Sequence, residues 1–266
     1  MSTERARVFP CSVPLSTSAE AIVLRVRPYA ESDKIVTFLT DHAGKLTGIA
    51  KGAKNSRRRF PNCLDPLARV RVYYRPRSGP GLVFMERCDL RRPASVYSEL
   101  PRLAYAQYLA ELVDVLTEEA HAVPEMFALL DLALELLVER PATAPFLRAF
   151  EMKLLTHAGY APPLRNCSRC GADLFGRDSA ILDPEHNYTF CSDCAPGASA
   201  PRCLALRGAT IEGLEALKSM TLPDAQQQHF DSRTMNESSL ALSALLAPHL
   251  RRPLRSLQVL RQVRHD

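Results

Sequence analysis

Residues 21–90 alternate between apolar and polar positions, which is the pattern of half-buried β-strands. In residues 21–27, Ile22, Leu24 and Val26 share one face, because successive side chains of a strand point to opposite sides. Similar short segments follow at 34–40, 45–50, 67–74 and 82–86, separated by loops or turns, several of which contain glycine or proline. Four or five short strands in so few residues predict a small closed β-barrel, and the oligonucleotide-binding (OB) barrel is a common design of this size.

From about residue 98 the apolar spacing changes to that of α-helices. Apolar side chains in residues 100–120 recur at i, i+3, i+4, i+7, i+8 and i+11, which forms one wide stripe. Further helices are predicted at 125–139 and 145–159, each opened by a proline, and at 209–219, 238–246 and 254–263. The polar, glutamine-rich stretch 224–237 is predicted to be a loop. Together these segments predict a helical bundle that an inserted segment interrupts.

Two closely spaced cysteine pairs lie in this interruption: Cys167 with Cys170, and Cys191 with Cys194. Two residues separate the members of each pair and twenty separate the pairs, which is typical of a zinc ribbon in which four thiolates surround one ion. Four cysteines saturate Zn²⁺ and leave no position for a water nucleophile, so the ion is expected to be structural. The alternatives are a ribbon that folds without metal and one that holds iron.

The composition of the 266 residues excludes several classes of protein. Hydrophobic residues make up 46% and charged residues 24%, the balance of a globular protein with a buried core. No stretch approaches the roughly 18 uninterrupted apolar residues of a membrane span, and the N-terminal residues lack the apolar core of a signal peptide. The protein is therefore expected in the cytoplasm, where clustered cysteines favour a metal site over disulfides.

Charge is distributed unevenly between the two regions. Residues 20–92 carry 16 Lys and Arg against 7 Asp and Glu, whereas residues 93–266 carry 16 against 21. A local excess of this size attracts polyanions, because each phosphate that Lys or Arg neutralises releases condensed counterions. The barrel is therefore predicted to bind nucleic acid. The alternative is a solvated surface that only maintains solubility.

The basic residues of the barrel follow its strands and one loop. Arginines recur at every second strand position, as Arg25 and Arg27 do, so several share one face. The loop 51–59 contains five Lys and Arg residues and is expected to stay mobile until an anion orders it. Four aromatic residues among these charges are candidates either for stacking bases or for the barrel core: Tyr29, Phe60, Tyr73 and Tyr74.

These patterns predict an α+β fold: an N-terminal OB-fold β-barrel, then a C-terminal helical bundle with an inserted four-cysteine zinc ribbon. The boundaries are expected at residues 1–19 for a flexible extension, 20–92 for the nucleic-acid-binding barrel and 93–266 for the helical domain, with the ribbon at about 164–200. The sequence contains no glycine-rich phosphate loop, HExxH, GxSxG or dinucleotide-binding motif. No enzyme activity is therefore predicted.

Several short motifs occur in a specific order along the chain. They include Glu20-Ala-Ile-Val-Leu-Arg25, Arg27-Pro-Tyr-Ala-Glu-Ser-Asp-Lys34, Ala50-Lys-Gly-Ala-Lys54, Tyr105-Ala-Gln-Tyr-Leu-Ala-Glu-Leu112, Cys167-Ser-Arg-Cys-Gly171 and Arg252-Pro-Leu-Arg-Ser-Leu257. In these motifs, from about residue 20 to its end, the chain resembles the RecO family of bacterial DNA-repair recombination mediators. The usual family pattern lacks the extension at residues 1–19, to which no function is assigned.

The resemblance implies the same three-part fold and a mediator that is not an enzyme. Such a protein binds single- and double-stranded DNA and anneals complementary strands. It helps to load RecA onto strands coated by single-stranded-DNA-binding protein (SSB), together with RecR and in some settings RecF. Contact with the SSB C-terminal tail and association with the nucleoid during repair are also implied. The expected DNA contacts are Arg27, Lys34 and Lys51 on the matched motifs, supported by Arg25, Lys45, Lys54, Arg57, Arg58 and Arg59.

Three other classes of protein remain open. A zinc-ribbon RNA-binding adaptor of a transcription or translation complex would prefer RNA to DNA. A metal-dependent nuclease or ligase subunit would cleave nucleic acid or turn over nucleotides. A scaffold without nucleic-acid contacts would behave on DNA columns independently of salt.

Overall fold

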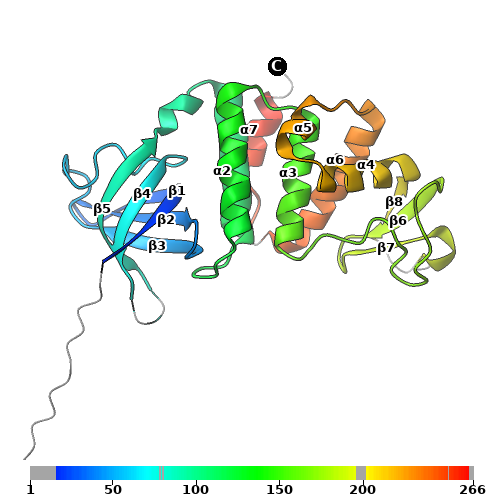
Figure 1. Cartoon of the computed structure of the whole chain (residues 1–266), viewed down its shortest axis with the longest axis horizontal. Helices are drawn as coiled ribbons and strands as arrows, with labels where there is room; N and C mark the ends of the chain where they lie inside the picture. Colours follow the sequence, from blue (N-terminus) through cyan, green and yellow to red (C-terminus); the bar gives the residue numbers. More distant parts are fainter. Residues whose placement is uncertain (1–15, 78, 80, 196–201, 251, 264–266) are drawn as a thin grey trace, which may run out of the picture.

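The computed structural model describes residues 16–77, 79, 81–195, 202–250 and 252–263. A five-stranded barrel lies at one end, helices follow it, and a small three-stranded sheet lies at the other end (Figure 1). This arrangement confirms the predicted fold class. Of the predicted N-terminal extension, residues 1–15 lie outside the described part of the chain, and residues 17–19 already belong to the first strand.

The barrel closes because its first strand has partners on both sides. Its strands are β1 (Thr17–Tyr29), β2 (Asp33–Thr40), β3 (Lys45–Ala50), β4 (Arg69–Arg75) and β5 (Val83–Arg92), in the order β1-β2-β3-β5-β4. β4 pairs antiparallel with β1, and β3 pairs parallel with β5, which completes the ring. Alternate residues such as Val23, Phe38 and Val72 fill the interior, so their neighbours along each strand face outwards.

The helices form the second, larger core. They are η1 (Ala94–Tyr97), α1 (Leu100–Leu116), α2 (Pro124–Glu139), α3 (Ala144–His157), α4 (Gly208–Ser219), α5 (Leu222–Gln227), α6 (Ser232–Leu246), η3 (Ala247–His249) and α7 (Arg255–Val263). Fully buried Phe146, Phe150 and Leu134 belong to this core. No helix in the described part of the chain is long and apolar enough to cross a membrane.

The prediction of a loop at residues 224–237 is wrong, because this stretch contains most of α5 and the start of α6. Thr221 accepts a hydrogen bond from the Asp224 amide, and Asp231 accepts one from the Thr234 amide. Both are N-caps, the positions at which short polar side chains stabilise a helix. Polar residues that resemble a loop in the sequence therefore begin helices here.

The cysteine-bearing insertion folds against the helices. Its strands are β6 (Ser179–Asp183), β7 (Tyr188–Phe190) and β8 (Leu204–Arg207), in the order β7-β6-β8, and the short helix η2 (Ser192–Cys194) follows β7. Leu182, Phe190 and Leu206 are buried in the same apolar cluster as the bundle. The stability of this insertion is therefore coupled to that of the helical domain.

Polar contacts from α1 and the loop after it hold the helical domain against the barrel. Asp114 is only 9% exposed. Its carboxylate accepts a hydrogen bond from Lys45 Nζ at 3.3 Å and pairs with Arg25 Nε at 3.4 Å. The Ala120 amide donates to the Lys45 carbonyl at 2.8 Å. Two cations of the barrel are thus bound to a carboxylate of the other domain.

A second set of contacts joins the barrel to α2. Asp131 pairs with Arg69 and Arg92, each at 3.1 Å. Burial raises the pKa of the Asp131 carboxyl above its ordinary value, although the two arginines act in the opposite direction. Ile22 and Leu39 on the outside of the barrel pack into the apolar cluster of the bundle. Apolar and ionic contacts together fix the relative position of the two domains.

Replacing Gly44 with alanine is expected to disturb this domain interface. Gly44 has a φ of +72°, and an added Cβ would lie 2.2 Å from the carbonyl oxygen of His121. We expect a loss of about 2 to 4 kcal/mol, from the left-handed backbone and from overpacking, measured by urea unfolding. Gly159→Ala is the control, because Gly159 has a φ of +77° and open space around its Cβ position. Equal losses for the two variants would contradict a steric role for Gly44.

Candidate nucleic-acid interface and metal centre

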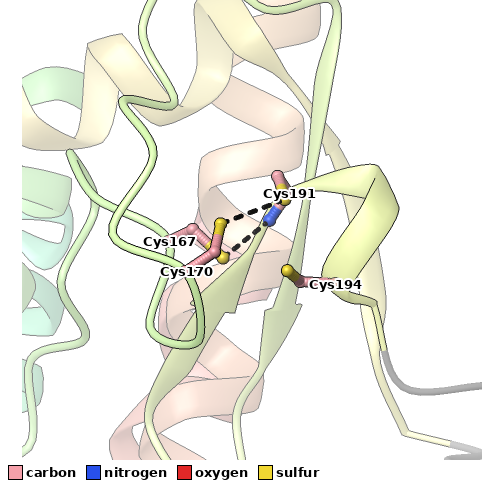
Figure 2. A group of neighbouring side chains, drawn as sticks. All are labelled: Cys167, Cys170, Cys191 and Cys194. Carbon is pink, nitrogen blue, oxygen red and sulfur yellow. Dashed lines mark hydrogen bonds between the residues drawn. The ribbon is translucent and has the colours of Figure 1, made fainter.

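The four predicted cysteines come together at one point of the ribbon. Their Sγ atoms all lie within 4.8 Å of one another. Cys167 and Cys170 come from a loop, and Cys191 and Cys194 from the two ends of the short helix η2 (Figure 2). The Cys170 and Cys191 sulfurs are 3.8 Å apart, and the Cys191 amide donates to the Cys167 sulfur at 3.4 Å. The turn at the first pair is closed by the Gly171 amide, which donates to the Cys167 carbonyl at 2.9 Å.

The electrostatics of the cluster fit a metal ion. Burial raises the pKa of the Cys167 thiol, but amides of Cys170, Cys191 and Arg169 outweigh it and lower that pKa to about 6. The Cys194 thiol donates hydrogen bonds to the sulfurs of Cys170 and Cys191, which stabilise its protonated form and raise its pKa to about 12. One thiolate is therefore favourable and further ionisation is opposed, unless a cation balances the accumulating charge. Four sulfur donors at this spacing could hold such an ion.

A hollow of about 730 Å³ lies at the barrel beside the loop after β3. Three of the nine predicted DNA contacts line it: Lys34, Lys54 and Arg57. Lys34 lies on the same side of β2 as Val36 and Phe38, which face the barrel interior, so its side chain extends from the barrel mouth. The hollow is open and predominantly polar, as expected of a surface that binds an extended polyanion.

The loop that forms the hollow is held by its own hydrogen bonds. Asp33 Oδ1 accepts from the Gly52 amide at 2.8 Å. Lys54 Nζ donates to the carbonyls of Ala30 and Glu31, and Arg59 donates to the carbonyl of Lys51. These hydrogen bonds give the loop a defined conformation in the structure. Two of its five cations, Lys54 and Arg59, stabilise the loop itself.

The remaining predicted cations fall into two groups. Arg25 and Lys45 bind Asp114, as described above, and face the helical domain. The others are Arg27, Lys34, Lys51, Arg57 and Arg58, and within the described residues no carboxylate lies within ion-pair distance of them. We refer to Lys34, Lys51, Arg57 and Arg58 as the loop cations.

The four aromatic candidates for base stacking differ in how far they are exposed. Phe60 and Tyr74 are each 4% exposed and belong to the barrel core, so the base-stacking interpretation is wrong for these two. Tyr29 is 50% exposed. Tyr73 is half-buried, with the guanidinium carbon of Arg87 3.5 Å from the centre of its ring. Arg87 is not among the cations predicted from the sequence, although a charged residue recurs at every second position of β5, at Arg87, Asp89 and Arg91.

Two family models match the chain. The model described as Recombination protein O N terminal matches residues 15–94, and Recombination protein O C terminal matches residues 97–258. Proteins named DNA repair protein RecO are similar over nearly their whole lengths. That of Anaeromyxobacter sp. (strain K) is 35% identical over 91% of this chain and 94% of its own. That of Syntrophus aciditrophicus is 32% identical over 92% of this chain and 95% of its own. That of Myxococcus xanthus is 34% identical over 93% of this chain and 98% of its own.

Proposed function

The chain belongs to the RecO family of DNA repair proteins, and we propose that it acts there as a recombination mediator without catalytic activity of its own. It would bind single- and double-stranded DNA and anneal complementary strands. It would also help to load RecA onto SSB-coated single strands together with RecR. The observation that carries this proposal is the group of loop cations, two of which, Lys34 and Arg57, line the open polar hollow of the barrel.

The loop cations suit a strand held by its phosphates. In the described part of the chain these four cations form no ion pair with a carboxylate, so their charge is available to phosphate groups. A strand bound in this way keeps its bases free to pair. Two strands that repel each other in solution approach more easily once cations shield their phosphates. Arg27 lies on the outer side of β1 opposite Ile35 and would extend the contact along the barrel.

We assign structural Zn²⁺ to the cysteine cluster as part of the same proposal. Cys167, Cys170, Cys191 and Cys194 would each supply one thiolate, and the ion would hold the two loops of the ribbon together. Because all four positions are filled by sulfur, no water would be activated there. The ribbon would then serve folding or partner binding rather than chemistry.

The partners of the protein would be those of a mediator. We propose RecR and the SSB C-terminal tail as direct protein partners, with RecF and RecA acting indirectly. The protein would work in the cytoplasm and associate with the nucleoid during repair. The barrel is basic and the helical region is acidic, which supports the proposal that DNA binds to the barrel.

Annealing of complementary oligonucleotides coated by SSB, without nucleotide, tests the proposal. We expect this protein to accelerate annealing, and we expect the acceleration to fade as salt rises, because phosphate contacts are salt-dependent. Binding to single strands without acceleration would contradict the annealing role. A strong preference for RNA would favour an RNA-binding adaptor, and strand cleavage would favour a nuclease.

A further inference from the structure

The barrel carries a second arginine-rich surface, formed by β1, β4 and β5 on its outer side. Antiparallel pairing places Tyr73 opposite Arg87, and Arg71 opposite both Asp89 and Glu20. Paired residues of neighbouring strands share a side, and the register of β5 shifts between Met85 and Arg87, so that Met85 faces the interior and Arg87 the outside. The outward residues include Arg71, Arg75, Arg87 and Arg91, of which the last three are exposed. We call these four residues the arginine face. None of them is among the residues that line the loop hollow.

Two guanidinium groups of this face each contact an aromatic ring and form an ion pair with a carboxylate. The carbon of the Arg87 guanidinium lies 3.5 Å from the centre of the Tyr73 ring, and Arg87 also pairs with Asp89 at 2.9 Å. Arg75 lies over Phe84 and pairs with Glu86. Contact with an aromatic ring and an ion pair together hold a flexible side chain in place. Little conformational entropy is then lost when such a group binds a ligand.

The arginine face keeps an excess of positive charge and remains open. Its acidic neighbours are Glu20, Glu86 and Asp89. Glu20 is shared among Arg71 at 3.0 Å, Arg91 at 3.6 Å and Arg69 at 3.7 Å. The side chains of Arg75 and Arg87 are 49% and 50% exposed. Arg77 adds a further positive charge beyond Arg75, whereas Arg69 pairs with Asp131 of α2. Fewer carboxylates than guanidinium groups leave phosphate-binding capacity on this face.

We propose that the arginine face binds a second single strand of nucleic acid while the loop cations hold the first. The inference rests on the proposed function, because it assumes that the loop cations bind DNA. One molecule that holds two strands raises the effective concentration of one strand near the other. Segments of the strands that extend beyond the barrel would then meet and pair.

The chemistry of the face favours nucleic acid over an acidic peptide. All four cations are arginines, whose planar groups bind phosphate through two parallel hydrogen bonds and also stack on bases. The Arg87 guanidinium, which lies on Tyr73 and is half exposed, is a platform on which a base can stack. Side chains at every second position of a strand are about 6 to 7 Å apart, so the face presents a row of charges to an extended polyanion.

The experiment uses two labelled oligothymidylates of about eight nucleotides, a length within one OB-fold site. One carries a donor dye and the other an acceptor, and they cannot pair with each other. We expect the full-length protein to bind two strands per chain and to give energy transfer between them. Arg75→Gln with Arg87→Gln should retain one strand and lose at least about fivefold in energy transfer. The salt slope for the second strand should fall by about 1.4, for two phosphate contacts.

The matched control is Arg140→Gln with Arg233→Gln, which removes two exposed charges from the helical domain. This variant should bind both strands as the unchanged protein does. One strand per chain in the unchanged protein, or two strands in the Arg75/Arg87 variant, would overturn the inference and leave the proposed function standing. Absence of any strand binding would overturn both. If an acidic decapeptide bound the face more tightly than the oligonucleotide, an acidic protein partner would replace the second strand.

Discussion

Replacing Cys191 with serine is expected to release the metal ion and to destabilise the entire helical domain. Cys191 is buried beside Cys167, and serine is a poor ligand for a soft tetrahedral site. Because ribbon residues such as Leu182 and Phe190 belong to the core of the bundle, loosening the ribbon exposes that core. Loss of a structural metal is among the few changes that cost more than about 4 kcal/mol.

Metal analysis and thermal unfolding check this prediction. The unchanged protein should contain one zinc per chain after dialysis, and Cys191→Ser should contain close to none. For a chain of this size, 4 kcal/mol corresponds to a decrease of roughly 10 °C in Tm, followed by circular dichroism. Cys203→Ser is the control, since Cys203 lies next to β8, outside the four-sulfur cluster, and should leave zinc content and Tm almost unchanged.

Two outcomes would refute the zinc assignment. A Cys191→Ser variant as stable as the unchanged protein, together with no bound metal in either, would mean that the ribbon folds through its apolar contacts alone. One iron per chain in place of zinc would preserve the structural role and change the identity of the ion.

Local patterns in the sequence predicted the elements that position both candidate sites. Alternation along β1 and β4 indicated strands, because a half-buried strand needs apolar residues at every second position. The cysteine spacing indicated the metal centre, because two short turns bring four thiolates to one point. The strand pattern repeats at every second residue, and the two cysteines of each pair lie only three positions apart in the sequence. Both signals can therefore be read without the tertiary structure.

The features that the sequence did not predict depend on partners far away in the chain. Lys45 resembles any other exposed lysine, and only the tertiary structure places it against Asp114 of α1. Likewise, Lys54 and Arg59 belong to a basic run, but carbonyl groups of the barrel determine their role. Charge counts therefore identified the barrel as the basic domain, whereas the division of its cations into loop-stabilising, domain-bridging and available groups required the fold.

We expect Lys34→Glu combined with Arg57→Glu to weaken single-strand binding by at least about a hundredfold. Both residues line the hollow beside the barrel loop, and each reversal removes a charge-assisted phosphate contact worth about 1.5 to 3 kcal/mol. The slope of log affinity against log salt should fall by about 1.4. Fluorescence anisotropy of a labelled oligothymidylate at several salt concentrations measures both quantities.

Two further variants separate this effect from non-specific charge and from lost stability. Arg140→Glu with Arg233→Glu introduces the same change in net charge on the helical domain and should reduce affinity only slightly. Lys45→Glu should instead lower the free energy of unfolding, because it places a second carboxylate beside buried Asp114. The opposite pattern would contradict the loop hollow as the binding site. In that pattern the Lys34/Arg57 variant keeps its affinity and salt slope, and Lys45→Glu loses DNA binding without losing stability. The strand would then lie along the domain interface.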